Sequence, residues 1–552
     1  MARTASSVCV PVVAGLLATL LCSVAHTAAR TPPAEGVAAD AHRQPLPSVP
    51  RRGHDRQQLN GGAEAAEGAL SIGATIEQRL GGPRGAVEGI VSIGATAAES
   101  AVASVWTSLD GAGWTVSNST VSVPATVPGT VPDALFRAGV EGDPHFGYNQ
   151  QTVLEYSTAS NFTYTRYFPT PVGYAAATMH EGASGAGMGQ SGTDAGVGGR
   201  SGGLIQLVFD GIDTASRIVL NGHVLGSTNN MHLQYAFDAG AALLPAGTAA
   251  DNRLEVHIEP AVEYAARQAA QNGDPGCLKH NRGNYWPAKF GHDTICSTYV
   301  RKNTGSFGWD CARAFVAQGI WKSVWLRTVA VADIDEIVPA VTGRIAPDGA
   351  SNQFEVASRV FLTVASACSL TLKVEGSWVP ADPLEHTITL PAGRHNVSLP
   401  VLAATNVRLW WPNGFGEPSL YNITVTLSVV GSDGGSDVVA AKSKSIGFRT
   451  FDFVGSVGNN TDYHGNASLY FRVNGRPMFA KGHNWMPSTV LIADTPSDRA
   501  MKQSRLADAR SVGANTIRVW GGGIYETEAF YEAADRYVGA ICPRVSVGWL
   551  PN

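Results

Sequence analysis

The sequence contains few charged residues and no excess of positive charge. Only 15% of its 552 residues are Asp, Glu, Lys or Arg, and 40 basic side chains face 45 acidic ones, for a net charge of −5. An average soluble domain is about 25% charged. Without a basic surplus the chain has no extended positive field for phosphates, so we expect no nucleic-acid partner. The 44% of apolar residues also excludes a chain kept open by its own charge.

Metal and redox motifs are also missing. The sequence has no Cys-x-x-Cys pair and no His-Glu-x-x-His, and the spacing of its 14 histidines suggests no ligand set. We therefore expect neither a metal nor a cofactor. Two of the seven cysteines, Cys9 and Cys22, lie near the N-terminus, and the other five are an odd number. At least one thiol is then left without a partner in the chain, and one candidate disulfide joins Cys277 to Cys296.

Long apolar runs are rare, and the one that is present lies at the N-terminus. Arg3 precedes a mostly apolar run from Val8 to Ala25, and small residues follow to Ala29. This order predicts a cleaved signal peptide over residues 1–29. A signal anchor is the alternative, although Pro11 and Gly15 weaken a spanning helix.

Six Asn-x-Ser/Thr triplets also favour a secretory route. They begin at Asn118, Asn161, Asn396, Asn422, Asn459 and Asn466. We therefore expect a glycoprotein of the lysosome or the extracellular space, with no stable membrane association after signal cleavage. The oligomeric state is left open.

Two low-complexity tracts interrupt the chain. Residues 30–100 are rich in Ala, Gly, Arg and Glu and contain two near copies of one phrase, which begin at Leu70 and Val91. Two copies are too few for a solenoid, so we expect a poorly ordered leader. Residues 181–203 are almost wholly Gly, Ala, Ser, Met and Thr, which predicts a flexible insertion between two strands.

The middle of the chain has the pattern of strands joined by turns. Leu204–Phe209 and Ser216–Leu220 are followed by turn dipeptides, and Arg253–Ile258 alternates polar with apolar residues. We expect a first β-sandwich over residues 101–330. Similar runs over residues 331–455, a length of about 120 residues, predict a second sandwich of immunoglobulin type.

After residue 455 the pattern changes to strands alternating with helices. A short apolar run, Met478–Ala480, precedes a helix that Thr495 opens, and Thr516–Trp520 reads as a further strand. Phe530 begins a second helix face, which includes Ala533, Ala534 and Tyr537. This alternation predicts a parallel sheet with a site where its strands end, near Trp485 and Trp520.

Six phrases occur in a characteristic order along the chain. They are Val127–Pro132, Phe209–Thr214, Ser306–Asp310, Gly319–Lys322, Trp410–Gly414 and Trp520–Glu526. Over about Trp106 to Tyr537 the chain resembles the β-mannosidases of glycoside hydrolase family 2. The resemblance implies a multidomain, mainly β protein: a galactose-binding-like jelly-roll sandwich, an immunoglobulin-like sandwich and, over residues 456–552, the start of a (β/α)8 TIM barrel. Asn515–Arg518 followed by Val519-Trp520-Gly521 resembles the mannosidase branch of the family rather than its galactosidases or glucuronidases.

The resemblance also implies retaining hydrolysis of terminal β-D-mannose from oligosaccharides or glycoproteins. In that chemistry one Glu is the nucleophile and a second is the acid/base. The family's acid/base lies in an Asn-Glu phrase, and no Asn-Glu dipeptide occurs in the 552 residues. We therefore expect both catalytic carboxylates beyond Asn552 and an inactive chain as written. A shifted reading frame or truncated gene model would explain this, because the sequence departs from the family pattern after Tyr537.

Two other functions stay open, namely a non-catalytic carbohydrate-binding remnant and an endo-acting mannosidase on glycoprotein glycans. Under either enzymatic reading the partner is a β-mannoside oligosaccharide. The sequence does not separate exo from endo action.

The resemblance carries over a set of substrate-binding residues. Trp309 and Asp310 belong to a loop of the first domain that reaches the mannose pocket in the family, where an indole stacks on the sugar and a carboxylate accepts its hydroxyl hydrogens. A structural Trp with a turn Asp is the alternative, and Cys311-Ala312 replaces the Trp-Gly that the family usually has next. The barrel part supplies Trp520, Asn484 and Trp485 as further binding residues and Arg518 as a supporting residue.

Overall fold

The computed structural model describes ten stretches of the chain, all within one compact unit, Ala86–Asn552. They are residues 104–171, 203–274, 296–309, 313–347, 349, 351–378, 383–430, 435–456, 468–538 and 540–542. The predicted signal peptide and leader lie outside the described residues, as does the predicted insertion except for Gly203. Asn459 and Asn466 also lie outside them.

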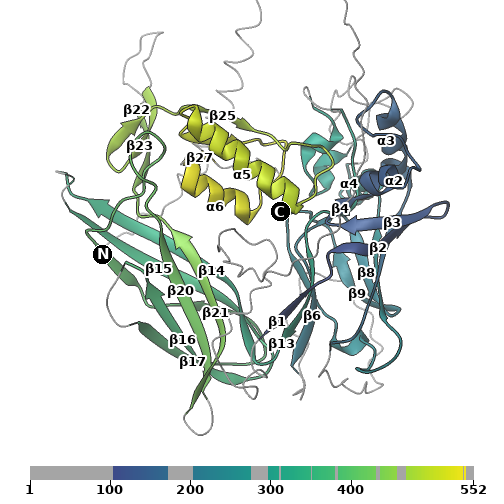
Figure 1. Ribbon diagram of the computed structural model, residues 1–552, viewed down its shortest axis with the longest axis horizontal. Coiled ribbons are helices and arrows are strands. Elements are labelled where there is room, and N and C mark those ends of the chain that lie inside the picture. Colours follow the sequence, from purple (N-terminus) through teal and green to yellow (C-terminus); the bar gives the residue numbers. More distant parts are fainter. Residues whose placement is uncertain are drawn as a thin grey trace, which may run out of the picture. The chain divides into compact units, whose positions relative to one another are not determined.

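The first described region is a β-sandwich (Figure 1). Its strands are β1 (Val105–Ser108), β2 (Gly111–Ser117), β3 (Ser122–Val127), β4 (Gly129–Thr130), β5 (Phe162–Phe168), β6 (Leu204–Phe209), β7 (Ile212–Asp213), β8 (Ser216–Leu220), β9 (His223–Thr228), β10 (Tyr235–Asp238), β11 (Asn252–Ile258), β12 (Gly319–Ile320) and β13 (Val324–Val329). They form sheets of order β3-β2-β5-β11-β8-β9, β1-β13-β6-β10 and β4-β12-β7. The first two sheets pack their apolar faces on one core.

Local sequence explains much of this sandwich. Burial alternates along β11, as the predicted pattern requires. The predicted turn after β8 is present, and Asn221 and Gly222 both have positive φ, at 52° and 84°. Two positive φ values are what a tight type I′ turn needs, and Asn and Gly adopt them readily. Strand β8, which precedes this turn, matches the predicted strand Ser216–Leu220.

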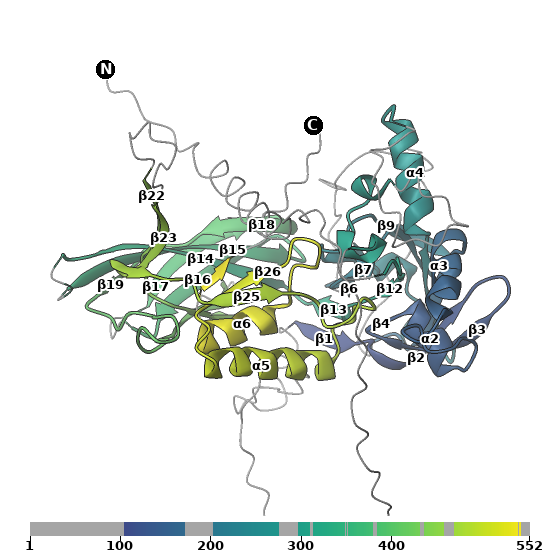
Figure 2. The same ribbon diagram turned by 90° about the horizontal axis from the view of Figure 1, so that it is seen from above.

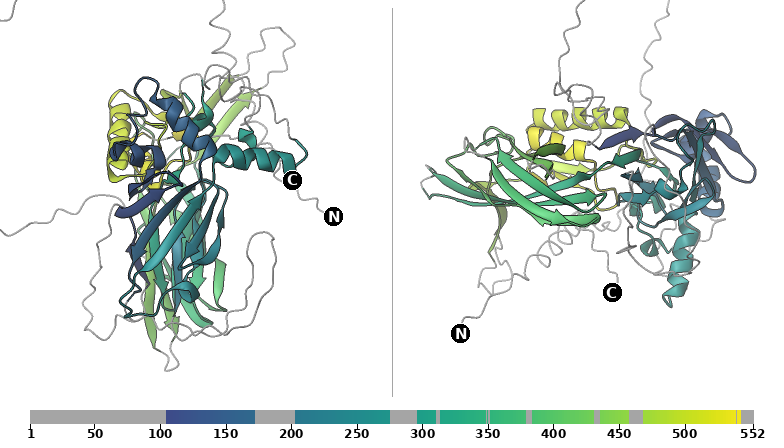
Figure 3. Two further views of the ribbon diagram at one scale, coloured as in Figure 1. Left: turned by 90° about the vertical axis from the view of Figure 1, so that its right-hand side faces the viewer. Right: turned by 90° about the horizontal axis from the view of Figure 1, so that it is seen from below.

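Helices gather at one end of the strands of this first sandwich (Figure 3). They are α2 (Val131–Arg137), α3 (Asn149–Ala159) and α4 (Ala261–Gln271), together with the 3₁₀ turns η3 (Ser297–Tyr299) and η4 (Thr304–Phe307). The 3₁₀ turn η1 (Gly240–Ala242) lies at the other end, where the Ala242 carbonyl accepts a hydrogen bond from Asn221, directly after β8. Ala261, Ala265 and Ala269 repeat every four residues along α4 and pack in a small core with Phe307. This core holds the base of the loop that carries Trp309.

The second region is an antiparallel sandwich. Its strands are β14 (Ala332–Ile345), β15 (Asn352–Val364), β16 (Cys368–Gly376), β17 (Leu384–Leu390), β18 (Gly393–Ser398), β19 (Leu402–Thr405), β20 (Tyr421–Val430) and β21 (Ser436–Ile446). One sheet has the order β14-β15-β18, with β19 also paired to β15, and the other has the order β17-β16-β20-β21. Their inner faces share one core, so the second sandwich predicted from strand alternation is present.

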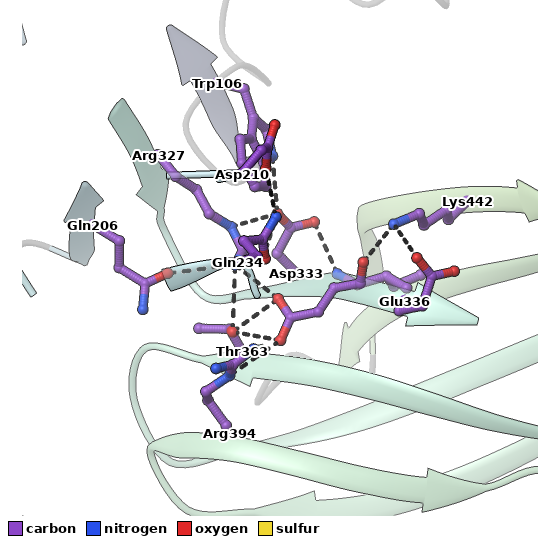
Figure 4. Close-up of polar contacts among 12 residues, drawn as sticks. Trp106, Gln206, Asp210, Gln234, Arg327, Asp333, Glu336, Thr363, Arg394 and Lys442 are labelled. Carbon is purple, nitrogen blue, oxygen red and sulfur yellow. Dashed lines mark hydrogen bonds and ion pairs between the residues drawn. The ribbon is translucent and has the colours of Figure 1, made fainter. Parts of the chain in front are cut away.

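A buried polar cluster joins the two sandwiches (Figure 4). Arg327 on β13 pairs with Asp333 at 2.8 Å and Asp335 at 2.7 Å, both on β14. The indole N–H of Trp106 donates to the same Asp333 oxygen at 3.3 Å, and Thr363 on β15 donates to Asp335 at 2.9 Å. Because these partners satisfy the guanidinium, its burial does not leave an unpaired charge.

The third region combines a small antiparallel sheet with a parallel one. Its strands are β22 (Phe451–Ser456), β23 (Ser468–Val473), β24 (Arg476–Met478), β25 (Gly482–Trp485), β26 (Thr516–Val519) and β27 (Ala540–Cys542), and its helices are α5 (Pro496–Ser511) and α6 (Glu528–Tyr537). The strands β25, β26 and β27 pair in parallel, and both helices lie on one side of β25 and β26 (Figure 2). This is the strand–helix alternation that the sequence predicts.

Two details of this region differ from or refine the sequence expectations. The apolar run Met478–Ala480 is not the first parallel strand: β24 ends at Met478, and the parallel strand β25 begins at Gly482. Thr495 does cap α5, since its hydroxyl accepts from the backbone N–H of Asp498 at 3.2 Å. Among the described residues no helix is long and apolar enough to cross a membrane.

Candidate functional site

Two neighbouring strand positions place the first pair of predicted site residues together. Asn484 on β25 is in register with Arg518 on β26. The Arg518 guanidinium donates to the Asn484 side-chain oxygen at 2.9 Å, and this contact is exposed. The pair thus presents amide and guanidinium N–H groups at one face of the parallel sheet, where they can donate to a carboxylate or to sugar oxygens.

Trp309 and Trp520 come from different regions of the chain and meet at their rings. The ring centroids lie 5.5 Å apart and the planes cross at 86°, an edge-to-face contact. Trp309 is 37% exposed, and Trp520, which directly follows β26, is half-buried. The two aromatic surfaces expected at one pocket are therefore adjacent.

Two glycines make room for the Trp520 ring. A Cβ on Gly305 would lie 2.7 Å from the ring, and a Cβ on Gly522 would lie 2.4 Å from it. The backbone N–H of Gly305 also donates to the carbonyl of Gly522 at 2.7 Å. The two loops approach this closely only because both positions lack a side chain.

Trp485 lies on the opposite face of the parallel sheet from Asn484, because successive strand residues alternate. Its ring is buried and packs on Phe530 of α6 with centroids 4.7 Å apart. Its indole N–H donates to a buried Glu526 oxygen at 3.0 Å. The predicted substrate contact of Trp485 stays a prediction, and its described partners are a helix and a carboxylate.

A second set of contacts ties the same loop to the first sandwich. Ile524 packs with Met231 and Trp321 in a small core. Beside it the rings of His232 and Tyr525 meet edge to face at 5.2 Å, and Tyr525 is 46% exposed. Sequence reasoning did not single out His232, and it included Tyr525 only as a member of the phrase Trp520–Glu526. No periodicity marks either residue, since both lie in loops.

A buried network of charges lies beneath Trp485. Lys502 on α5 pairs with Glu526 at 2.7 Å and with Asp498 at 2.8 Å. Burial by itself would lower the pKa of Lys502, but these two carboxylates raise it above its ordinary value. The ammonium therefore stays charged at neutral pH and holds both carboxylates in place. Sequence reasoning missed this network, although Glu526 closes one of the six phrases.

Some of the predictions fall outside the described part of the chain. Asp310 is among them, so its role in substrate binding stays a prediction. Cys296 is disulfide-bonded, but Cys277 also lies outside the described residues, and their pairing stays a prediction. Cys368 is a free thiol.

Comparison with protein families identifies two stretches of the chain. Residues 198–322 match the glycosyl hydrolase 2 galactose-binding domain-like family, and residues 343–449 match glycosyl hydrolases family 2. A β-mannosidase of Rattus norvegicus is 30% identical over 440 residues, which cover 76% of this chain and 43% of that protein. The chain belongs to glycosyl hydrolase family 2. This confirms the resemblance seen in the six sequence phrases.

Further relatives of this family 2 chain agree. β-Mannosidase B of Aspergillus terreus is 33% identical over 339 residues, covering 61% of this chain and 36% of that protein. The crystal structure of a β-D-mannosidase from Dictyoglomus thermophilum superimposes with a TM-score of 0.62 at 26% identity, covering 80% of this chain and 47% of that one. The chain thus spans less than half of the length of these relatives.

Proposed function

We propose that this family 2 chain is the substrate-binding part of a β-mannosidase, an enzyme that hydrolyses terminal β-D-mannose with retention of configuration. Three relatives or solved neighbours with β-mannosidase names support the substrate class. The observation that carries the proposal is the contact between Trp309 and Trp520, rings from two regions of the chain that meet at 5.5 Å.

The proposed roles follow from the chemistry of each side chain. Trp309 and Trp520 offer apolar faces for a pyranose ring, and Asp310 accepts hydrogens from sugar hydroxyls. Asn484 donates and accepts hydrogen bonds at the same end of the sheet. Arg518 supports Asn484 and is placed to hold a carboxylate. Trp485 remains a proposed substrate-binding residue, although its ring packs on Phe530 of α6, on the face of the sheet opposite Asn484.

The catalytic step needs two carboxylates about 5 Å apart. No Asn-Glu phrase occurs in the sequence, and Glu526, although buried near the site, is already bound by Trp485 and Lys502. We therefore assign neither the nucleophile nor the acid/base to a residue of this chain. The proposal predicts binding of β-mannosides and no hydrolysis by these 552 residues alone.

The test measures hydrolysis and binding separately. Hydrolysis of a chromogenic β-mannoside is assayed with the purified chain and with the chain extended through any downstream coding sequence, and methyl β-D-mannopyranoside binding is measured by calorimetry. Binding by both forms and cleavage by the extended form alone would support the proposal. Binding without cleavage by either form would favour a carbohydrate-binding protein, and cleavage by the 552-residue chain would contradict the assignment of the catalytic pair.

We also propose the secretory location and the glycosylation predicted from the sequence. Asn161, Asn396 and Asn422 are exposed. The side-chain oxygen of Asn118 accepts from the N–H groups of Thr120 and Val121 at 2.9 Å. Glycopeptide mass spectrometry after secretion from eukaryotic cells would test this: glycans are expected at the three exposed sites, and secretion without any of them would contradict it.

A further inference from the structure

Glu526 is a buried carboxylate between two elements of the candidate site. Its side chain is 1% exposed. One oxygen accepts the indole N–H of Trp485 at 3.0 Å, and the other pairs with the Lys502 ammonium at 2.7 Å. Each carboxylate oxygen therefore has a different partner, and the group joins the end of strand β25 to helix α5.

Lys502 fixes the position of this carboxylate. Its ammonium also pairs with Asp498, one turn earlier in α5, at 2.8 Å. Thr495 caps the same first turn. A charged group held on two sides has little freedom to rotate, so Glu526 receives the Trp485 indole in one geometry.

Trp485 connects this carboxylate to two residues of the candidate pocket. Its carbonyl accepts the backbone N–H of Trp520 at 2.9 Å. Its neighbour Asn484 carries the hydrogen bond with Arg518. A shift of Trp485 therefore displaces Trp520 and Asn484 together, although neither of them touches Glu526 in the contacts described.

We propose that Glu526 is a positioning residue for the sugar pocket: through Trp485 it sets the location of the Trp520 ring against Trp309. The expected effect of this inference on mannoside binding rests on the proposed function. The coupling between Glu526 and Trp520 does not, because it is a property of the free protein. A substrate-binding pocket needs its contact groups held in place to within fractions of an ångström, and the partners of those groups supply that restraint.

The test labels the 12 tryptophans of the full chain with 5-fluorotryptophan and records ¹⁹F NMR spectra. The Trp309, Trp485 and Trp520 signals are assigned with single Trp→Phe variants. Two variants then break the contact. Trp485→Phe keeps an aromatic ring against Phe530 but has no N–H, and Glu526→Gln has only one accepting oxygen for two donors.

The matched control is Glu528→Gln, the same chemical change two residues along the chain. Glu528 is 49% exposed and pairs with Lys444 at 3.4 Å, on the helix surface. This variant should leave the Trp520 signal and mannoside binding as in the unchanged protein. Thermal unfolding of every variant shows which of them are folded.

The expected result has two parts. In both Glu526→Gln and Trp485→Phe the Trp520 signal moves or broadens without ligand, and affinity for methyl β-D-mannopyranoside falls about tenfold. The double variant binds no more weakly than Trp485→Phe alone, because both changes remove one contact. If Glu526→Gln does not fold, the Trp520 signal of Trp485→Phe alone tests the proposal.

Two outcomes distinguish a failure of the positioning role from a failure of the proposed function. A Trp520 signal that is unchanged in folded Trp485→Phe would overturn the positioning role, whatever the affinity. A Trp520 signal that moves, in a protein that binds no mannoside even when unchanged, would support the positioning role and contradict the proposed function.

Discussion

The edge of one indole ring meets the face of another where Trp309 approaches Trp520, with centroids 5.5 Å apart and planes at 86°. The two residues are more than two hundred positions apart in the chain, and Gly305 and Gly522 permit the approach. Neither the first sandwich nor the strand–helix region could form this pair alone. Sugar binding between these two rings would therefore depend on the contact between the first sandwich and the strand–helix region.

Trp520→Ala is predicted to weaken methyl β-D-mannopyranoside binding about tenfold or more, since large aromatic side chains at the centre of a contact carry most of its energy. Isothermal titration calorimetry would measure the change. Tyr148→Ala is the control, because Tyr148 is also aromatic and 79% exposed but lies at the start of α3. Equal losses in the two variants would contradict a pocket at Trp520.

Arg327→Met is predicted to reduce the free energy of unfolding by about 3–5 kcal/mol, because it leaves Asp333 buried without its cation and Asp335 with only the longer ion pair to Arg394, at 3.7 Å. Both carboxylates are at most 12% exposed. Urea denaturation followed by tryptophan fluorescence would measure the loss.

The matched control for this ion pair lies on the surface of the same sandwich. Arg137 pairs with Asp133 at 2.8 Å, and the Arg137 side chain is 70% exposed. Arg137→Met should cost less than about 1 kcal/mol because water screens an exposed pair. A loss in Arg327→Met no larger than in this control would show that the cluster does not hold the sandwiches together.

Local sequence predicts the elements of this fold well where one face of a strand is buried. The alternation in β11 and the cap at Thr495 act within a few residues, so the sequence shows them directly. The start of β25 was predicted wrongly for the opposite reason. The apolar run Met478–Ala480 marks the end of the antiparallel strand β24, whereas β25 begins with the exposed residues Gly482, His483 and Asn484 and has no apolar run of its own.

The faces of the candidate site residues could be predicted less well than their positions. Asn484 and Trp485 are adjacent, and strand geometry puts them on opposite faces, but nothing local says which of them faces helix α6. That choice follows from the packing of Trp485 on Phe530, about forty-five residues later in the chain. The cluster around Arg327 depends in the same way on Trp106 and Thr363, which are distant in sequence.

The pH dependence of stability is predicted to include Asp110. Burial raises the pKa of its carboxyl above the ordinary value, even though the backbone N–H of Val324 donates to it at 2.8 Å. A raised pKa means that folding favours the protonated acid. The contribution of Asp110 to stability is therefore fully present below the ordinary Asp pKa of about 3.9 and is lost as pH rises through the raised value.

Asp110→Asn should remove this dependence, because the amide keeps an oxygen for Val324 and has no charge to bury. The variant is expected to gain stability over the unchanged protein as pH rises from about 4 to 7. Urea midpoints at several pH values would measure it, with Asp251→Asn as the control at an exposed position. A constant difference between Asp110→Asn and the unchanged protein across this range would contradict the assignment.

Asn413 is predicted to hold the second sandwich against the end of helix α5. Its side-chain amide donates to the carbonyls of Arg510 at 2.9 Å and Ala514 at 3.0 Å. The Arg510 carbonyl also accepts the backbone N–H of Gly513 at 3.0 Å, and a carbonyl can accept two hydrogen bonds, so the Asn413 amide adds a second one at the end of α5. Asn413→Ala should lower the local protection of the last turn of α5 and of β26 by about 1–2 kcal/mol.

Hydrogen exchange measured by mass spectrometry would locate this effect. Exchange should quicken at residues 506–519 in Asn413→Ala and stay unchanged in the core strands of the second sandwich, which Asn413 does not support. Thr405→Ala, at an exposed position on β19, is the control and should alter neither. Faster exchange spread evenly over both regions would mean that Asn413 stabilises the second sandwich itself and not its contact with α5.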